Sequence, residues 1–135
     1  MIPYIKERHE YWWNYLLERV WVPENFKSAI PETRFVTKKS RIAGSASSMY
    51  CEYNLLYAME QGEEFDETIC HEICHTFAKR IKLHEGHGSF WEYLYQVVCG
   101  VKRGKYHYYK KPNEDTIAAA KAIRKLLKLK AQMKD

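Results

Sequence analysis

Histidine and glutamate side chains in one short stretch of this chain have a spacing that suits metal chemistry. Residues 71–75 read His-Glu-Ile-Cys-His, an HExxH pentad. On a helix, the four-residue spacing places His71 and His75 on one face, so that both imidazoles can reach a single ion. Glu72 lies beside that face, where its carboxylate can reach a water molecule on the ion but is badly placed to ligate it. The pentad therefore predicts a metal site with Glu72 as general base.

Two histidines do not complete a catalytic zinc site, which needs a third protein ligand and an open position. Four residues are candidates for the third ligand: His84, Glu85, His87 and Glu92. His84 is too near the end of the predicted helix to fold back over it. His87 is flanked by two glycines, which permit the necessary turn, and Glu92 would bring a carboxylate from a second helix. The spacing favours His87 and leaves Glu92 open.

The cysteines offer a second set of soft side chains. Cys70 and Cys74 repeat the four-residue spacing of the histidines, about 100° around the same helix. They could serve as alternative ligands, but we favour two small residues packed against the sheet. With Cys51 and Cys99 they make four cysteines, and we expect free thiols in a reducing compartment because a chain of this length needs no disulfide.

The elements that position these residues follow from periodicity. Helices are predicted over about 4–20, 63–82, 89–98 and 114–133, and short strands over about 33–37, 42–48 and 49–55. Three consecutive strands with short links favour antiparallel pairing. We therefore expect an α+β domain in which a three-stranded antiparallel sheet packs on helices that include the HExxH helix.

The composition is that of a single soluble domain. The chain has 135 residues, of which 46% are hydrophobic and 29% charged, which excludes a wholly disordered protein. No apolar run approaches the ~20 residues that span a membrane, and the N-terminus lacks the apolar segment of a signal peptide. We expect a cytoplasmic protein, not secreted and with no membrane partner.

The positive charge is concentrated at the C-terminal end. Residues 100–135 carry a net charge of +8, whereas the first 99 residues carry −3. The first part of this basic region mixes tyrosines with five cations, Lys102, Arg103, Lys105, Lys110 and Lys111. Cations and aromatic rings together suit the phosphates and stacked bases of single-stranded DNA. We predict DNA contact through these residues and the basic helix over 114–133, although that helix could instead pack on the domain.

The order of these motifs resembles the SprT-like family of zinc metalloproteases over about residues 5–100. The matching segments are Ile42-Ala43-Gly44, Tyr53-Asn54-Leu55-Leu56, the pentad with the four residues before it, and Glu85-Gly86-His87-Gly88-Ser89-Phe90-Trp91. They correspond to an AG strand, an NPxL-like strand, HExxH and a GHGxxF/W segment. Two departures are Leu55 in place of proline and the absence of a cysteine zinc ribbon.

This resemblance implies a zincin-like metalloprotease domain over residues 1–105, with residues 106–135 packed on it or appended to it. It also implies that His71, His75 and His87 hold Zn²⁺, that Glu72 is catalytic, and that the substrates are proteins associated with DNA. The alternative is a non-catalytic zinc-containing module that binds DNA or protein and has a fourth protein ligand. Glu72 favours the enzyme, because a structural site has no need of it.

Overall fold

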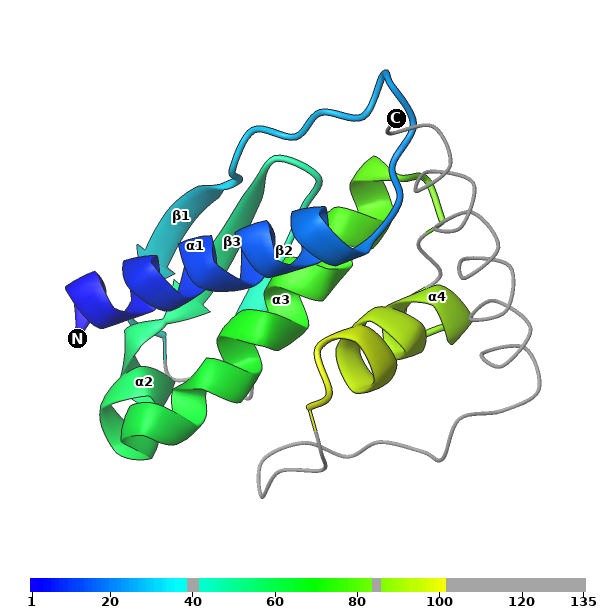
Figure 1. Cartoon of the computed structure of the whole chain (residues 1–135). Helices are drawn as coiled ribbons and strands as arrows, with labels where there is room; N and C mark the ends of the chain where they lie inside the picture. The colour runs from blue at the N-terminus through cyan, green and yellow to red at the C-terminus, as the bar shows by residue number, and fades with distance from the viewer. Residues whose placement is uncertain (39–41, 84–85, 102–135) are drawn as a thin grey trace.

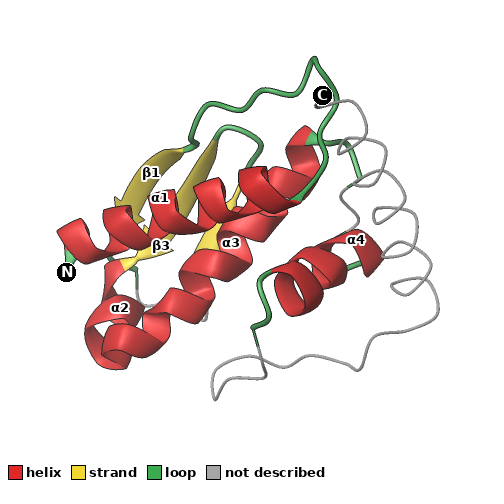
Figure 2. Cartoon of the chain, viewed as in Figure 1, coloured by secondary structure: helices red, strands yellow, loops and turns green. Residues whose placement is uncertain are grey.

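The structure is a computed structural model that describes residues 1–38, 42–83 and 86–101. Its α-helices are α1 (Ile2–Arg19), α2 (Leu55–Gln61), α3 (Phe65–Arg80) and α4 (Ser89–Glu92). A 3₁₀ turn, η1 (Gly62–Glu64), precedes α3, and a π-helical segment, η2 (Tyr93–Val98), continues α4. The strands are β1 (Glu32–Val36), β2 (Gly44–Ala46) and β3 (Tyr50–Asn54) (Figure 2). The α+β class predicted from the sequence is confirmed.

The sheet is mixed, with the strand order β1-β3-β2. β2 pairs with β3 antiparallel, but β1 pairs with β3 in parallel, with Glu32 opposite Tyr50 and Val36 opposite Asn54. The prediction of an all-antiparallel sheet was therefore wrong for one of its two pairings. The reason is that the chain passes from β1 to the far side of β3, forms β2 there, and then reverses, so that β1 and β3 run in the same direction.

α3 lies at the centre of the fold, where it packs against β2 and β3 and has α1 and α4 beside it (Figure 1). Its stripe of Phe65, Ile69, Ile73 and Phe77 is buried, as the periodicity predicts. α1 packs alongside α3, and His9 of α1 reaches the ring of Tyr53 on β3. α4 and η2 lie against α3 on the side away from the strands (Figure 1). The HExxH helix is thus held from two sides.

The predicted helices over 4–20, 63–82 and 89–98 correspond to α1, to η1 with α3, and to α4 with η2. α2 was not predicted, because residues 49–55 were interpreted as strand. β3 ends at Asn54, whose side-chain oxygen accepts a hydrogen bond from the Leu56 amide at 3.2 Å and so caps α2. The basic loop, the helix over 114–133 and the boundary after residue 105 lie outside the described residues.

All four cysteines are free thiols, as expected. Among the residues that the structure describes, no helix is both long enough and apolar enough to cross a membrane.

Candidate metal centre

Three imidazole rings converge at one side of α3. Nε2 of His71 lies 3.2 Å from Nε2 of His75 and 3.1 Å from Nε2 of His87. The three nitrogen atoms that could bind an ion all lie within 4.8 Å of one another. His71 and His75 share a face of α3 because they are one helical turn apart. His87 returns to that face through Gly86, which adopts a positive φ of 58°, as the glycine-flanked spacing suggested.

The arrangement fits a metal ion. With metal–nitrogen bonds of about 2.0–2.1 Å, a tetrahedral site has nitrogen–nitrogen edges of about 3.3–3.4 Å, close to the two distances above. Burial lowers the pKa of His87, with a smaller opposing effect from the charge of Glu92. The neutral ring is the form that offers a lone pair to a metal. His71, His75 and His87 can therefore hold one ion.

Trp91 of α4 contacts all three histidines. Its ring lies parallel to that of His75, with centroids 5.1 Å apart, and lies 4.7 Å from His71 and 4.6 Å from His87. Its indole N–H donates a hydrogen bond to the backbone carbonyl of His71 at 3.2 Å. Tyr95 stacks on Trp91, with ring centroids 4.8 Å apart, and lies 5.6 Å from the ring of His71. These two rings restrict the orientations that the imidazoles can take.

Glu72 is buried where α3 meets the edge strand β2. A Cβ atom placed on Gly44 would lie only 2.9 Å from Oε2 of Glu72, so the carboxylate packs directly on the backbone of β2. Burial raises the pKa of Glu72 to about 8, and the positive charge of Lys79 opposes this rise. At this pKa the carboxyl group is largely protonated near neutral pH, and the positive charge of a bound ion would favour the carboxylate form that accepts a proton.

Of the other candidate ligands, Glu92 lies in the described part of the chain and does not join this cluster. Glu92 is buried in α4 and influences His87 through its charge, but it is not in the group of converging ligand atoms found among the described residues. His84 and Glu85 lie outside the described part of the chain. The described geometry thus brings together the two histidines of the pentad and His87.

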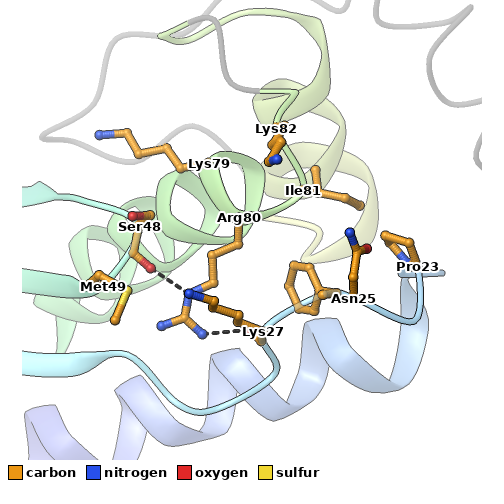
Figure 3. A pocket seen from close by; sticks show the side chains of 10 residues that line it. Pro23, Asn25, Lys27, Ser48, Met49, Lys79, Arg80, Ile81 and Lys82 are labelled. Carbon is orange, nitrogen blue, oxygen red and sulfur yellow. Dashed lines mark hydrogen bonds between the residues drawn. The ribbon is translucent and has the colours of Figure 1, made fainter.

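Side chains of α3 hold the turn between β2 and β3 beside the site. The Thr76 hydroxyl donates to the carbonyl of Ser47 at 2.8 Å, Lys79 Nζ donates to that of Ala46, and Arg80 Nε donates to that of Ser48. Arg80 also donates to the carbonyl of Lys27 at 2.8 Å, within a pocket of about 590 Å³ at the end of α3 (Figure 3). This pocket contains none of the three histidines, and its central guanidinium serves to join loops.

Sequence reasoning assigned no role to Trp91, Tyr95 or Gly44 in shaping the site. Trp91 and Tyr95 are four residues apart in the helix that follows His87, so their spacing already placed both rings on one face. For Gly44 the residue spacing gives no such signal, because its contact with Glu72 depends on how the sheet packs on α3; its place in the AG strand of the resemblance was the one pointer to it.

Comparison with known proteins gives one family match. The sequence profile of the SprT-like family matches residues 8–111, which is more than half of the chain. No curated protein and no solved structure gives a significant match.

Proposed function

The chain belongs to the SprT-like family, and from that premise we propose that it is a zinc-dependent endopeptidase. This family is generally associated with metallopeptidase activity. The observation that carries the proposal is the convergence of three Nε2 atoms beside a buried glutamate that does not join them. Three ligands leave room for water and substrate, whereas a purely structural zinc site is closed by four protein ligands.

His71, His75 and His87 would hold the zinc as neutral imidazoles, which leave the ion its full positive charge. When bound, Zn²⁺ polarises a peptide carbonyl and lowers the pKa of a water molecule toward ~7. Glu72 would take the proton from the attacking water and deliver it to the leaving amine. Its place between α3 and the backbone of β2 keeps the carboxylate in one position for both transfers.

The edge strand β2 would present the substrate. Among the described residues, β2 pairs only with β3, so its outer edge can pair with an extended peptide. Gly44 in this strand contacts Glu72, which would bring the peptide backbone close to the catalytic carboxylate. Because backbone hydrogen bonds would carry most of the recognition, cleavage should be tolerant of side chains. A peptide library that revealed one strictly required side chain would contradict this mode of binding.

We further propose that the substrates are proteins associated with DNA. The support is the net charge of +8 over residues 100–135, which follows a region of net charge −3. Lys102, Arg103, Lys105, Lys110 and Lys111 would contact phosphates, with single strands preferred because tyrosines lie between them.

The test is cleavage of an unfolded protein by the zinc-loaded full chain and by its Glu72→Gln variant. The amide keeps the shape of the carboxylate but cannot accept the proton, so we expect activity to fall by at least 10²-fold, with zinc content unchanged. Zinc retained in a parent chain that cleaves nothing would instead indicate a non-catalytic zinc-containing module. Equal activity in the variant would remove Glu72 from the mechanism.

A further inference from the structure

A second cluster of potential ligands lies on another face of α3. Cys70 and Cys74 each precede one histidine of the pentad, so their side chains project about 100° away from the imidazoles. They meet Cys99, which directly follows η2. The three sulfur atoms lie within 4.8 Å of one another, and Sγ of Cys74 is 3.9 Å from Sγ of Cys99. The two thiols of α3 thus face the end of η2, not the sheet against which the sequence analysis placed them.

The distance between the sulfur atoms of Cys74 and Cys99 matches that of a metal–thiolate site, and the third sulfur lies close enough to share an ion with them. With zinc–sulfur bonds of about 2.3 Å, the sulfur–sulfur edge is about 3.8 Å in a tetrahedral site and about 4.0 Å in a trigonal one. Cys51 provides a contrast within the same core, because it is buried too but its thiol pairs with the hydroxyl of Thr76 at 3.2 Å. A cysteine that only fills space needs no further thiols around it.

Of the three thiols, Cys99 is the one whose surroundings favour a thiolate, because burial raises the pKa of Cys70 and of Cys74. Hydrogen bonds from Cys70 and then Cys74 lower the pKa of Cys99, and the positive charge of Arg19 at the end of α1 adds to this effect. Burial and the charge of Asp66 act in the opposite direction. Cys70 and Cys74 have no solvent-exposed surface, whereas Cys99 is partly exposed and offers a route for an ion.

We propose that Cys70, Cys74 and Cys99 form a second metal site, which takes a thiophilic d¹⁰ cation such as Zn²⁺. The ion would join the end of η2 to the middle of α3, two elements that lie side by side (Figure 1). α3 carries the pentad histidines, and η2 carries Tyr95 and continues α4, which carries Trp91, so the site would hold together the walls of the histidine centre. The proposal of this second metal site does not depend on whether the protein is a peptidase.

The experiment is a titration of the reduced, metal-free full chain with Cd²⁺, followed by its sulfur-to-cadmium charge-transfer absorption. Cadmium bound by imidazoles gives no such band, so the reading is independent of the histidine centre. We expect the band to saturate at one equivalent and to persist in His87→Ala. Cys99→Ala should lower the affinity for the sulfur site at least tenfold. The matched control Cys51→Ala, which removes a buried thiol outside the cluster, should bind as the parent does.

Alkylation mapping of the unsubstituted chain gives a second reading that needs no variant to fold. The folded, native protein is alkylated with and without saturating Cd²⁺. We expect Cys99 to be protected when the ion is bound and to react when it is absent. The proposal is overturned if the native reduced chain shows no charge-transfer band, or if the band is unchanged in a folded Cys99→Ala protein. It is equally overturned if oxidation joins Cys74 to Cys99 while the reduced chain binds no cadmium.

Discussion

Gly44 and Glu72 lie far apart in the sequence and are in direct contact in the fold. A methyl group on Gly44 would lie 2.9 Å from Oε2 and 3.0 Å from Cγ of Glu72, and 3.0 Å from the backbone carbonyl oxygen of Glu52. The strand cannot easily move away from β3, so the carboxylate must shift. Because a displacement of about 1 Å in a catalytic group can cost ~10²-fold in rate, we expect Gly44→Ala to reduce peptidase activity at least tenfold.

The comparison for this variant is Ser45→Ala, one residue along the same strand, whose side chain is exposed. Zinc content should stay at the parent level in both proteins, because neither residue contacts the imidazoles. If Gly44→Ala retained full activity with a normal melting temperature, the close packing of Glu72 on β2 would have no part in catalysis.

His9 is a buried histidine whose two ring nitrogens have different partners. Nε2 lies 2.7 Å from the carbonyl of Pro31, which can only accept, so Nε2 carries the proton and Nδ1 accepts from the hydroxyl of Tyr53 at 2.8 Å. Burial is the largest effect on this residue and lowers its pKa below the ordinary value of 6.5. The neutral ring is therefore the form that suits the fold.

A histidine with a lowered pKa makes stability depend on pH. Below about pH 6.5 the unfolded chain binds a proton at His9 that the folded chain resists. The free energy of unfolding should therefore decrease as the pH is lowered, until the pH is below the pKa of His9 in the folded protein. Urea unfolding at about pH 7.5 and about pH 5.5 should show a larger loss in the parent than in His9→Gln, which cannot titrate. An equal loss in both proteins would assign the pH dependence to other groups.

At the level of single residues, the sequence predicted which ionisable groups meet but not what holds them. The spacing of the pentad brought His71 and His75 together because a helix fixes that geometry locally. His87 required a turn that its flanking glycines made possible. The contacts of Trp91 and Gly44 arise only when helices and sheet pack, and no local pattern encodes such packing.

The contact between α1 and α3 depends on a small polar cluster at the start of α3. Arg8 donates from Nε and Nη2 to the two carboxylate oxygens of Asp66, at 2.8 Å and 3.1 Å, and Trp12 Nε1 donates to the same carboxylate at 3.0 Å. Both charged side chains are about a quarter exposed, at 28% and 25%. The two-point geometry favours the pair, and the partial exposure limits its strength.

A double-mutant cycle of Arg8→Ala and Asp66→Ala, measured by urea unfolding, should give a coupling energy on the order of 1 kcal/mol. Asp66→Ala alone should be the more destabilising of the two substitutions, because it also leaves the indole N–H of Trp12 without its acceptor. A coupling energy indistinguishable from zero would mean that apolar contacts alone join the two helices. Glu18→Ala, at an exposed surface pair with Arg19, is the control and should change little.

The elements themselves were predicted better than their arrangement. The periodicity of the α1 and α3 segments identified both helices, since each has a continuous apolar face. The parallel pairing of β1 with β3 was missed because alternation along a strand does not say which strand is its neighbour. α2 was missed because its first residues follow β3 directly, and only the capping hydrogen bond from Leu56 to Asn54 marks the change.

The whole chain has an uneven charge, and we expect its basic end to bring the protein to nucleic acid. Reversing three charges with Lys125→Glu, Lys128→Glu and Lys130→Glu should weaken binding to single-stranded DNA and reduce the salt dependence. Each phosphate contact that is lost should change the log–log slope by roughly 0.7. Fluorescence anisotropy at several salt concentrations measures both quantities.

The control for the charge reversal is a substitution in the part of the chain that has a net negative charge. Replacing Lys6, an exposed residue of α1, by glutamate alters the net charge without touching residues 100–135. Zinc content and cleavage of a DNA-free unfolded protein should be the same in all these variants. An unchanged salt slope in the folded triple variant would exclude these three lysines from the DNA-binding surface.

The most direct test of the histidine centre is the recovery of peptidase activity when zinc is returned to the metal-free full chain. The parent should regain cleavage of an unfolded protein, and so should Glu92→Ala, because Glu92 is not among the converging ligand atoms. His71→Ala, His75→Ala and His87→Ala should each remain inactive at the zinc concentration that restores the parent. Recovery in His87→Ala but not in Glu92→Ala, or no cleavage by the zinc-loaded parent, would contradict a catalytic zinc held by these three histidines.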